Sequence, residues 1–239
     1  MFFWTDERIA FMRDAERETE YYRVVAEKIR RLLPASARLC DAGCGLGFLS
    51  FALSAHFPQI TAVDRDEKAV AFVRQELSAR ALSGVRPVCA DVLQLPCEPL
   101  FDAMIFCYFG RMEQILLAGA RLCRGRLIVI KKNYARHRFT SQPAPLEDET
   151  ADGAQLYLRR RAIAFSREDF SVEFGQPFRS EEDALRFFAC YDANRPDPAA
   201  LRQLLQKRLI RRQDAAFPFY LPQEKKVSLF VIDAEEARK

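Results

Sequence analysis

The sequence predicts an α/β protein with a doubly wound, mostly parallel sheet and helices on both faces. Two observations support this fold class. Short apolar segments alternate with segments of helical spacing between residues 38 and 130, which is the pattern of a parallel sheet whose strands are joined by helices. In addition, a glycine-rich turn directly follows the first apolar segment, at the point where a strand would lead into a helix.

The first elements follow from apolar spacing and from prolines. Residues 1–33 combine recurring apolar side chains with many charges, so we expect an N-terminal helix that Pro34 ends. The apolar stretch 38–41 is expected to be a strand. Helical spacing resumes over 46–56 and stops before Pro58.

The alternation then continues to residue 130. Residues 60–64 form the second expected strand, and Asp66 is a suitable N-cap for a helix that runs to about Leu82. The next expected elements are strands at 85–91, 102–109 and 126–130 and a helix at 112–123.

The regular alternation weakens after Lys131. Residues 133–153 are polar and contain Pro143 and Pro145, which favours a loop or lid. The elements expected beyond it are helices at 154–165, 180–191 and 198–212 and strands at 170–174 and 226–232. The last two of these helices would form an insertion before the final strand.

The composition excludes several classes of protein. Hydrophobic residues make up 49% of the chain and charged residues 29%, which excludes a disordered or fibrous protein. The seven cysteines are an odd number in apolar surroundings, so we expect free thiols in a reducing cytoplasm and neither a disulfide framework nor a metal site. The N-terminus becomes charged too soon for a signal peptide, and glycines and a proline interrupt the uncharged stretch 42–63, so no membrane span is expected.

The stretch 39–48 carries the main functional signal. A strand ends at Asp41, and Gly43, Gly45 and Gly47 then open a helix. Glycines permit a tight turn and a close approach of the backbone to a ligand. The helix N-terminus beyond them presents unpaired N–H groups and the positive end of the helix dipole. The stretch therefore predicts a ligand-binding turn.

Two further acidic residues end the next two expected strands. Asp64 follows the second strand and Asp91 the third, on the same edge of the sheet as Asp41. A carboxylate after the second strand can accept hydrogen bonds from the hydroxyls of a ribose. Structural alternatives stay open at this point: Asp41 and Asp91 also suit caps or turns, and Asp64 also suits the entry of a helix.

The glycine spacing separates two kinds of nucleotide-binding protein. A dinucleotide-dependent oxidoreductase has GxGxxG, which needs a glycine where this chain has Phe48. The chain instead has Asp-Ala-Gly-Cys-Gly-Leu-Gly at 41–47, followed by Val63-Asp64 and Ala90-Asp91. Over residues 38–132 this pattern closely resembles the class I S-adenosylmethionine-dependent methyltransferases.

The resemblance implies a fold, a cofactor and a set of cofactor contacts. The fold would be a Rossmann-like, seven-stranded sheet whose last strand, at 226–232, runs antiparallel. The cofactor would be S-adenosylmethionine, and its product S-adenosylhomocysteine. The residues implied at the cofactor are Asp41, Gly43, Cys44, Gly45 and Gly47 in the turn, Asp64 with Arg65 beside it at the ribose, Asp91 and Val92 at the adenine, and Phe106, Cys107, Tyr108 and Phe109 beside the methyl group.

The resemblance also implies a domain layout. Residues 1–239 would form a single methyltransferase domain. Within it, 1–34 would be an N-terminal helical cap, 35–132 the cofactor-binding core, and 133–239 a substrate-side region with the helical insertion and the last strands.

No residue is an evident catalyst. Methyl transfer mainly requires alignment of acceptor, methyl and sulfur and the exclusion of water, and a general base is needed only if the acceptor must lose a proton. The candidates for such a role are Tyr108, His137 and Tyr22. Tyr108 and Phe109 are equally well explained as core residues.

The favoured methyl acceptor is a small, partly apolar or aromatic molecule, because aromatic residues in the insertion would line an apolar pocket. These residues are Phe187, Phe188, Tyr191 and residues 217–220. An RNA or protein acceptor is the alternative, since the net charge of +4 permits a nucleic-acid partner and 159–161 is basic, although nearby acids balance it. A non-catalytic S-adenosylmethionine-binding module also stays open. The protein is expected to be cytoplasmic and to bind no membrane, and the sequence leaves its oligomeric state open.

Overall fold

The computed structural model describes residues 4–98, 100–134, 150–191, 197–214 and 216–239. The chain divides into two compact units. The large unit comprises Tyr22–Asn133, Leu146–Phe170 and Val227–Lys239, and the small unit comprises Met1–Tyr21, Tyr134–Pro145 and Ser171–Lys226. Most of the expected loop or lid at 133–153 lies outside the described residues, and so does His137.

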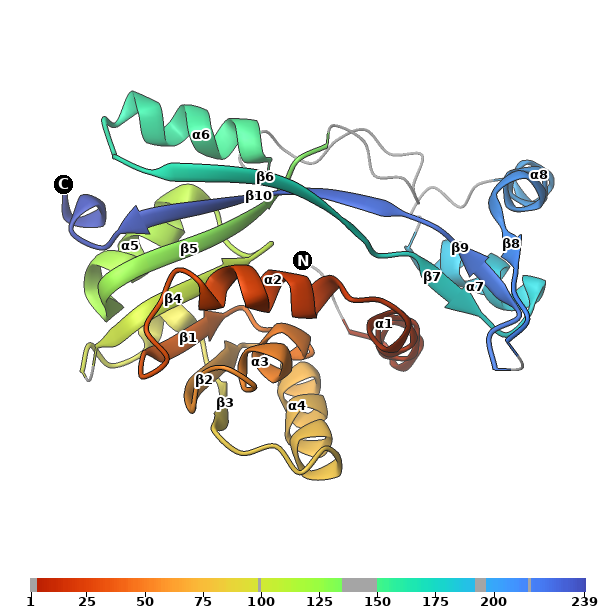
Figure 1. Cartoon of the computed structure of the whole chain (residues 1–239), viewed down its shortest axis with the longest axis horizontal. Helices are drawn as coiled ribbons and strands as arrows, with labels where there is room; N and C mark the ends of the chain where they lie inside the picture. Colours follow the sequence, from red (N-terminus) through yellow and green to blue (C-terminus); the bar gives the residue numbers. More distant parts are fainter. Residues whose placement is uncertain (1–3, 99, 135–149, 192–196, 215) are drawn as a thin grey trace. The chain divides into compact units, whose positions relative to one another are not determined.

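Figure 1 labels the helices and strands of these residues. The helices are α1 (Asp6–Glu18), α2 (Tyr21–Arg30), α3 (Phe48–Leu53), α4 (Glu67–Ala79), α5 (Met112–Leu122), α6 (Ala151–Arg160), α7 (Glu181–Tyr191) and α8 (Pro198–Arg208), with short 3-10 helices η1 (Val92–Gln94) and η3 (Glu236–Arg238). The strands are β1 (Arg38–Ala42), β2 (Gln59–Asp64), β3 (Val85–Cys89), β4 (Phe101–Cys107), β5 (Cys123–Lys132), β6 (Ser166–Glu173), β7 (Gln176–Phe178), β8 (Ile210–Arg211), β9 (Phe219–Leu221) and β10 (Glu224–Asp233).

A seven-stranded sheet dominates the fold, in the order β3-β2-β1-β4-β5-β10-β6 (Figure 1). Strands β1 to β5 pair in parallel with their neighbours. Strand β10 pairs antiparallel with β5, so that Val227 lies opposite Lys132 and Asp233 opposite Arg126. The prediction of a mostly parallel seven-stranded sheet with an antiparallel last strand is confirmed.

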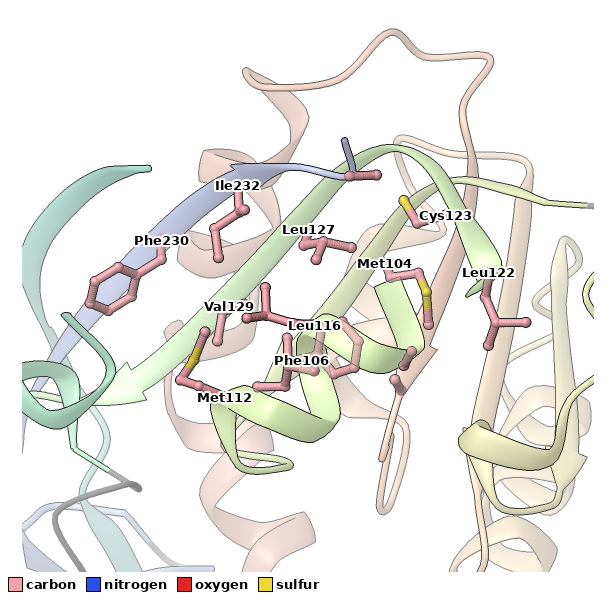
Figure 2. Packing of buried hydrophobic residues seen from close by; sticks show 14 of the residues in the cluster. Met104, Phe106, Met112, Leu116, Leu122, Cys123, Leu127, Val129, Phe230 and Ile232 are labelled. Carbon is pink, nitrogen blue, oxygen red and sulfur yellow. The ribbon is translucent and has the colours of Figure 1, made fainter. Parts of the chain in front are cut away.

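Helices cover both faces of this sheet, as predicted. On one face, Met112 and Leu116 of α5 pack with Phe106 of β4 and Val129 of β5, and all four side chains are buried (Figure 2). Helix α5 can approach so closely because residue 119 is glycine: a Cβ there would lie 2.4 Å from Leu127 Cδ1. Alternate residues of a strand point to opposite faces. Accordingly Cys40 and Ala42 belong to this core, while Asp41 between them meets α3 through Ser50 on the other face.

The single N-terminal helix expected over 1–33 is wrong: two helices occupy this stretch. Helix α1 ends at Glu18, and Thr19 takes an extended conformation with φ −131° and ψ 155°. The hydroxyl of Thr19 donates to the carbonyl of Ala15 at 2.8 Å, so a side chain replaces the backbone donor that would continue the helix. Helix α2 then starts at Tyr21.

Local capping explains most of the smaller boundary differences. Strand β3 ends at Cys89, before the expected 91, because Asp91 caps η1 and accepts from Leu93 N. Strand β4 ends at Cys107 because Tyr108 has φ +55°, which is outside the extended region. Helix α6 begins before the expected residue 154 because the Thr150 side chain accepts a hydrogen bond from Gly153 N at 3.1 Å.

The small unit has its own sheet and its own apolar core. Its three strands, in the order β7-β9-β8, were not predicted, and β8 lies within the stretch 198–212 that was expected to be helical. The rings of Phe11 and Phe187 meet edge-to-face at 5.3 Å, and Phe178 and Phe188 complete the cluster. Phe187 and Phe188 are 3% and 2% exposed, so the expectation that they line an open pocket is wrong: they fill this core.

None of the helices that the structure describes is both long enough and apolar enough to span a membrane.

Candidate functional site

The predicted ligand-binding residues that the structure describes gather at one edge of the large sheet. Strands β1 to β4 run parallel, so their carboxyl ends meet at the same edge. The glycine turn follows β1, Asp64 ends β2, Asp91 follows β3, and Cys107 ends β4. All of these residues belong to the large unit.

The glycine turn is attached to the end of the neighbouring strand β2. The backbone N–H groups of Gly43 and Cys44 both donate to the carbonyl of Val63, at 2.8 and 3.0 Å. Gly43, Gly45 and Gly47 have φ of +69°, +51° and +73°, a left-handed conformation that other residues adopt only with strain. At Gly47 a Cβ would also lie 2.8 Å from a methyl carbon of Val73. The turn therefore needs glycine for its backbone and, at Gly47, for the close approach to α4.

The carboxylate of Asp64 organises the turn from the other side. Its Oδ2 accepts from Gly45 N at 2.8 Å, and its Oδ1 accepts from Asp66 N at 2.9 Å. A carboxylate has about four acceptor positions, so each oxygen keeps capacity for one more donor. Asp64 thus has a structural role at a helix entry and keeps acceptor capacity on both oxygens, while its contact with a ribose stays a prediction.

Asp41 is buried beneath the turn. It is 1% exposed, and its Oδ2 accepts from the hydroxyl of Ser50 at 2.6 Å. Burial raises the pKa of Asp41 to about 6, against the lowering effect of the Ser50 hydrogen bond and with the Asp64 carboxylate adding to the rise. Its contact with a cofactor stays a prediction, while its tie to α3 is a structural role.

The thiol of Cys44 lies in the same turn and is half-buried. Burial raises its pKa well above the usual value, and the carboxylates of Asp41 and Asp64 add to this rise. This environment disfavours the thiolate form of Cys44 and so argues against a nucleophilic role.

The adenine position of the resemblance falls at η1. Oδ1 of Asp91 accepts from Leu93 N at 2.9 Å and so caps this short helix. Its Oδ2 has no hydrogen-bond partner among the described residues, and this oxygen can accept an amino group. Val92 is buried in the main core, so its side chain supports the edge from below.

The end of β4 brings two aromatic residues to the edge. Tyr108 has φ +55°, and its N–H donates to the carbonyl of Ile130 at 3.0 Å. The ring of Phe109 lies against the glycine turn, since a Cβ on Gly43 would be 2.1 Å from Phe109 Cγ. Cys107 is half-buried at the edge, whereas Phe106 is 1% exposed and packs into the core. A contact of Phe106 with a ligand would run through its backbone.

The remaining candidates are spread more widely. Arg65 is exposed beside Asp64, and its carbonyl accepts from the thiol of Cys89 at 3.8 Å. The ring of Tyr22 lies 5.6 Å from that of Phe48, the first residue of α3. Tyr108 is the candidate for proton transfer that stands at the strand ends. No group of three or more His, Cys, Asp or Glu side chains suited to a metal occurs in the described part of the chain.

Two residues that support this edge were missed in the sequence. Ser50, the partner of Asp41, is a polar residue in the otherwise apolar helix 48–53, and that contrast was an available signal. Arg121 of α5 binds the carbonyls of Leu93 and Leu95 in and after η1. No sequence pattern connects residues so far apart in the chain.

This edge defines the class of the large unit. A glycine turn after the first strand of a parallel sheet, with acids after the second and third, is the arrangement of a Rossmann-like domain that binds a nucleoside-containing cofactor. Residues 39–123 match the family described as methyltransferase domain. Over this segment the chain is therefore similar to the class I S-adenosylmethionine-dependent methyltransferases, a family whose cofactor is S-adenosylmethionine.

Individual relatives match part of the sequence or the fold of this chain. The ribosomal RNA small subunit methyltransferase C of Chromohalobacter salexigens is 32% identical over 136 residues, which are 54% of this chain and 40% of that protein. The chain thus matches well under half of the length of this relative. The YcgJ protein of Bacillus subtilis has the same fold, with a TM-score of 0.56 and 12% identity over 88% of this chain and 98% of that one. Magnesium protoporphyrin IX methyltransferase of Synechocystis, solved with bound S-adenosylmethionine, has a TM-score of 0.50 and 13% identity over 97% of this chain and 86% of that one.

Proposed function

We propose that this chain is an S-adenosylmethionine-dependent methyltransferase that holds its cofactor along the carboxyl edge of β1, β2 and β3. The observation that carries the proposal is the carboxylate of Asp64, which is fixed by two backbone N–H groups and keeps acceptor capacity on both oxygens. The open Oδ2 of Asp91 lies on the next strand end. These acceptors suit the ribose hydroxyls and the adenine amino group.

The residues at this edge have roles that suit methyl transfer. When bound, S-adenosylmethionine supplies a methyl group on a positively charged sulfur, which an acceptor can displace directly. The glycine turn would receive the methionine part, with Phe109 covering Gly43 and excluding water from that side. Tyr108 stands where the acceptor would approach, and its hydroxyl would hydrogen-bond and orient the acceptor atom. The main contribution of the protein is alignment.

A small, partly apolar or aromatic acceptor is the substrate class that we propose. The small unit contains a cavity of about 340 Å³, which is in the size range of small-molecule sites. Leu185, Leu205 and Phe219 provide apolar walls, and Arg202 and Gln206 provide donors. Of the aromatic residues expected in such a pocket, Phe219 is the one that lines it.

A ribosomal RNA acceptor is the second candidate. The 32% identity to a ribosomal RNA methyltransferase favours it. The exposed Arg159 and Arg160 at the end of α6 are available for phosphate contacts. A cofactor-binding module without catalysis is the third possibility, because the described residues provide no histidine at the strand ends.

Transfer of a labelled methyl group decides between these candidates. Wild type and Asp64→Ala would be incubated with methyl-labelled S-adenosylmethionine and either a small-metabolite extract or purified small-subunit ribosomal RNA. We expect Asp64-dependent label in the small-molecule fraction. Label in the RNA instead would replace the proposed acceptor with RNA and keep the enzyme class. Tight cofactor binding without transfer to either fraction would favour the non-catalytic module, and absence of cofactor binding would refute the proposal.

A further inference from the structure

The connection between β3 and β4 is unusual within the large sheet. Between Cys89 and Phe101 its only helix among the described residues is the three-residue η1. Two backbone hydrogen bonds form there, Gln94 N to Asp91 O at 2.9 Å and Leu95 N to Val92 O at 3.4 Å. So short a helix leaves most of its carbonyls without an internal partner. The position of Asp91, which starts η1, therefore depends on contacts from elsewhere.

Arg121 provides these contacts from the last turn of α5. Its Nη1 donates to the carbonyl of Leu93, and its Nη2 donates to the carbonyl of Leu95 at 3.4 Å. The same Nη2 lies 3.6 Å from the sulfur of Cys97. The planar guanidinium can hold several acceptors at once in a fixed geometry. Arg121 thus ties η1 and the following residues to α5.

Leu93 links this arginine to the carboxylate of Asp91. The N–H of Leu93 donates to Asp91 Oδ1 at 2.9 Å, while its carbonyl accepts from Arg121. A shift of η1 after loss of the guanidinium would therefore move the Asp91 carboxylate as well. Val92 anchors only the apolar side of the same segment, because it is buried in the core beneath the edge.

We infer that Arg121 is a positioning residue that sets the selectivity of the cofactor site for a purine with a 6-amino group. The inference rests on the proposed function, in which Oδ2 of Asp91 accepts that amino group. The contacts of Arg121 are with Leu93, Leu95 and Cys97, so its proposed action on the cofactor is indirect. Arg121 acts by holding Oδ2 of Asp91 at a position where this oxygen accepts a hydrogen bond from the 6-amino group. A 6-oxo group has no N–H to donate and is therefore rejected.

The test compares two ligands that differ at this position. Calorimetry would give the Kd of S-adenosylhomocysteine and of S-inosylhomocysteine, which carries a 6-oxo group, for wild type and for Arg121→Met. The methionine keeps an apolar stem and removes the donors. We expect wild type to prefer the 6-amino ligand, and the ratio of the two Kd values to fall by about tenfold in the variant, the equivalent of one hydrogen bond to a charged group. Arg121→Lys, which can reach one carbonyl, should show a smaller fall.

Arg238→Met is the matched control. Arg238 also donates to two backbone carbonyls at the end of α5, those of Cys123 at 2.8 Å and Ala120 at 3.3 Å, but it does not contact η1. Its loss should lower the melting temperature in the way that loss of Arg121 does, and leave the Kd ratio unchanged. If Arg121→Met does not fold, Arg121→Lys decides by the same ratio.

Failure of the inference is distinguishable from failure of the proposed function. If wild type binds neither ligand, the proposed function is wrong and the inference falls with it. If wild type prefers S-adenosylhomocysteine and the Arg121 variants keep the same ratio, the cofactor site stands and the inference is wrong. An equal fall of the ratio in Arg238→Met would also overturn it, because the effect would then be a general loosening around α5.

Discussion

Replacing Asp64 with alanine tests the ribose position and the glycine turn together. The carboxylate accepts from Gly45 N at 2.8 Å and from Asp66 N at 2.9 Å, and the ribose hydroxyls would be additional donors. A hydrogen bond to a charged group contributes about 1.5–3 kcal/mol. We expect the Kd of S-adenosylhomocysteine to rise by roughly 10- to 150-fold. Loss of the two backbone contacts should also lower the free energy of unfolding by about 1–2 kcal/mol.

A matched variant separates binding from stability in this experiment. Asp66→Ala removes the N-cap of α4, whose carboxylate accepts from Ala69 N at 3.1 Å, and should lower the free energy of unfolding by about 1 kcal/mol. Asp66 has no proposed ribose contact, so calorimetry should give a Kd close to that of wild type. If Asp64→Ala binds S-adenosylhomocysteine as wild type does, the ribose assignment is refuted. Equal losses of affinity in the two variants would refute it too.

Three further predictions concern the same edge of the sheet. Gly43→Ala should lower the free energy of unfolding by about 2–4 kcal/mol, because the residue has φ +69° and the new Cβ would lie 2.1 Å from Phe109 Cγ. In urea denaturation, the double variant Gly43→Ala with Phe109→Ala should regain part of the lost stability. If it regains none, the clash with Phe109 is contradicted. The pKa of Asp41 is raised from 3.8 to about 6, so the protonated form of Asp41 favours the folded state. This contribution to the free energy of unfolding is fully present below about pH 4 and is lost as the pH rises through 6. The contribution amounts to about 3 kcal/mol at most. Asp41→Asn should therefore gain stability relative to wild type as the pH rises from 4 to 7. A difference in unfolding free energy between the two proteins that stays constant over this range would argue against the raised pKa. Phe106→Leu should lower the free energy of unfolding by about 1–2 kcal/mol and leave the cofactor Kd unchanged, because the Phe106 ring is in the core; a raised Kd would place the ring at the ligand.

The elements of the large unit were predictable because local chemistry and tertiary packing agree there. Strands β1, β2, β4 and β5 are buried on both faces, so each of them appears in the sequence as a continuous apolar run. Asp66 caps α4, as its position in the sequence suggested. The break at Thr19 was not predictable from spacing, because no glycine or proline marks it. Strands β7, β8 and β9 span only three, two and three residues, too few for an alternating pattern to appear.

The candidate site was predictable in its chain positions and less so in its contacts. The motif located the turn and the acids because each follows directly from a strand end. It did not reveal that Asp41 faces Ser50 beneath the turn, that the side chain of Phe106 faces the core, or that Arg121 supports η1. These features depend on which strand face a residue occupies and on contacts between distant segments, and neither is encoded locally.

The double attachment of Asp64 has an evolutionary consequence. A duplicated copy of this protein that lost its catalytic role would still need an acceptor for Gly45 N and Asp66 N, and it would still need a cap for η1 at Asp91. Purifying selection for folding alone would retain both acids after selection for methyl transfer had ended. The two carboxylates would then persist in active and inactive descendants alike. Loss of activity in such a lineage would therefore not become visible at Asp64 or Asp91.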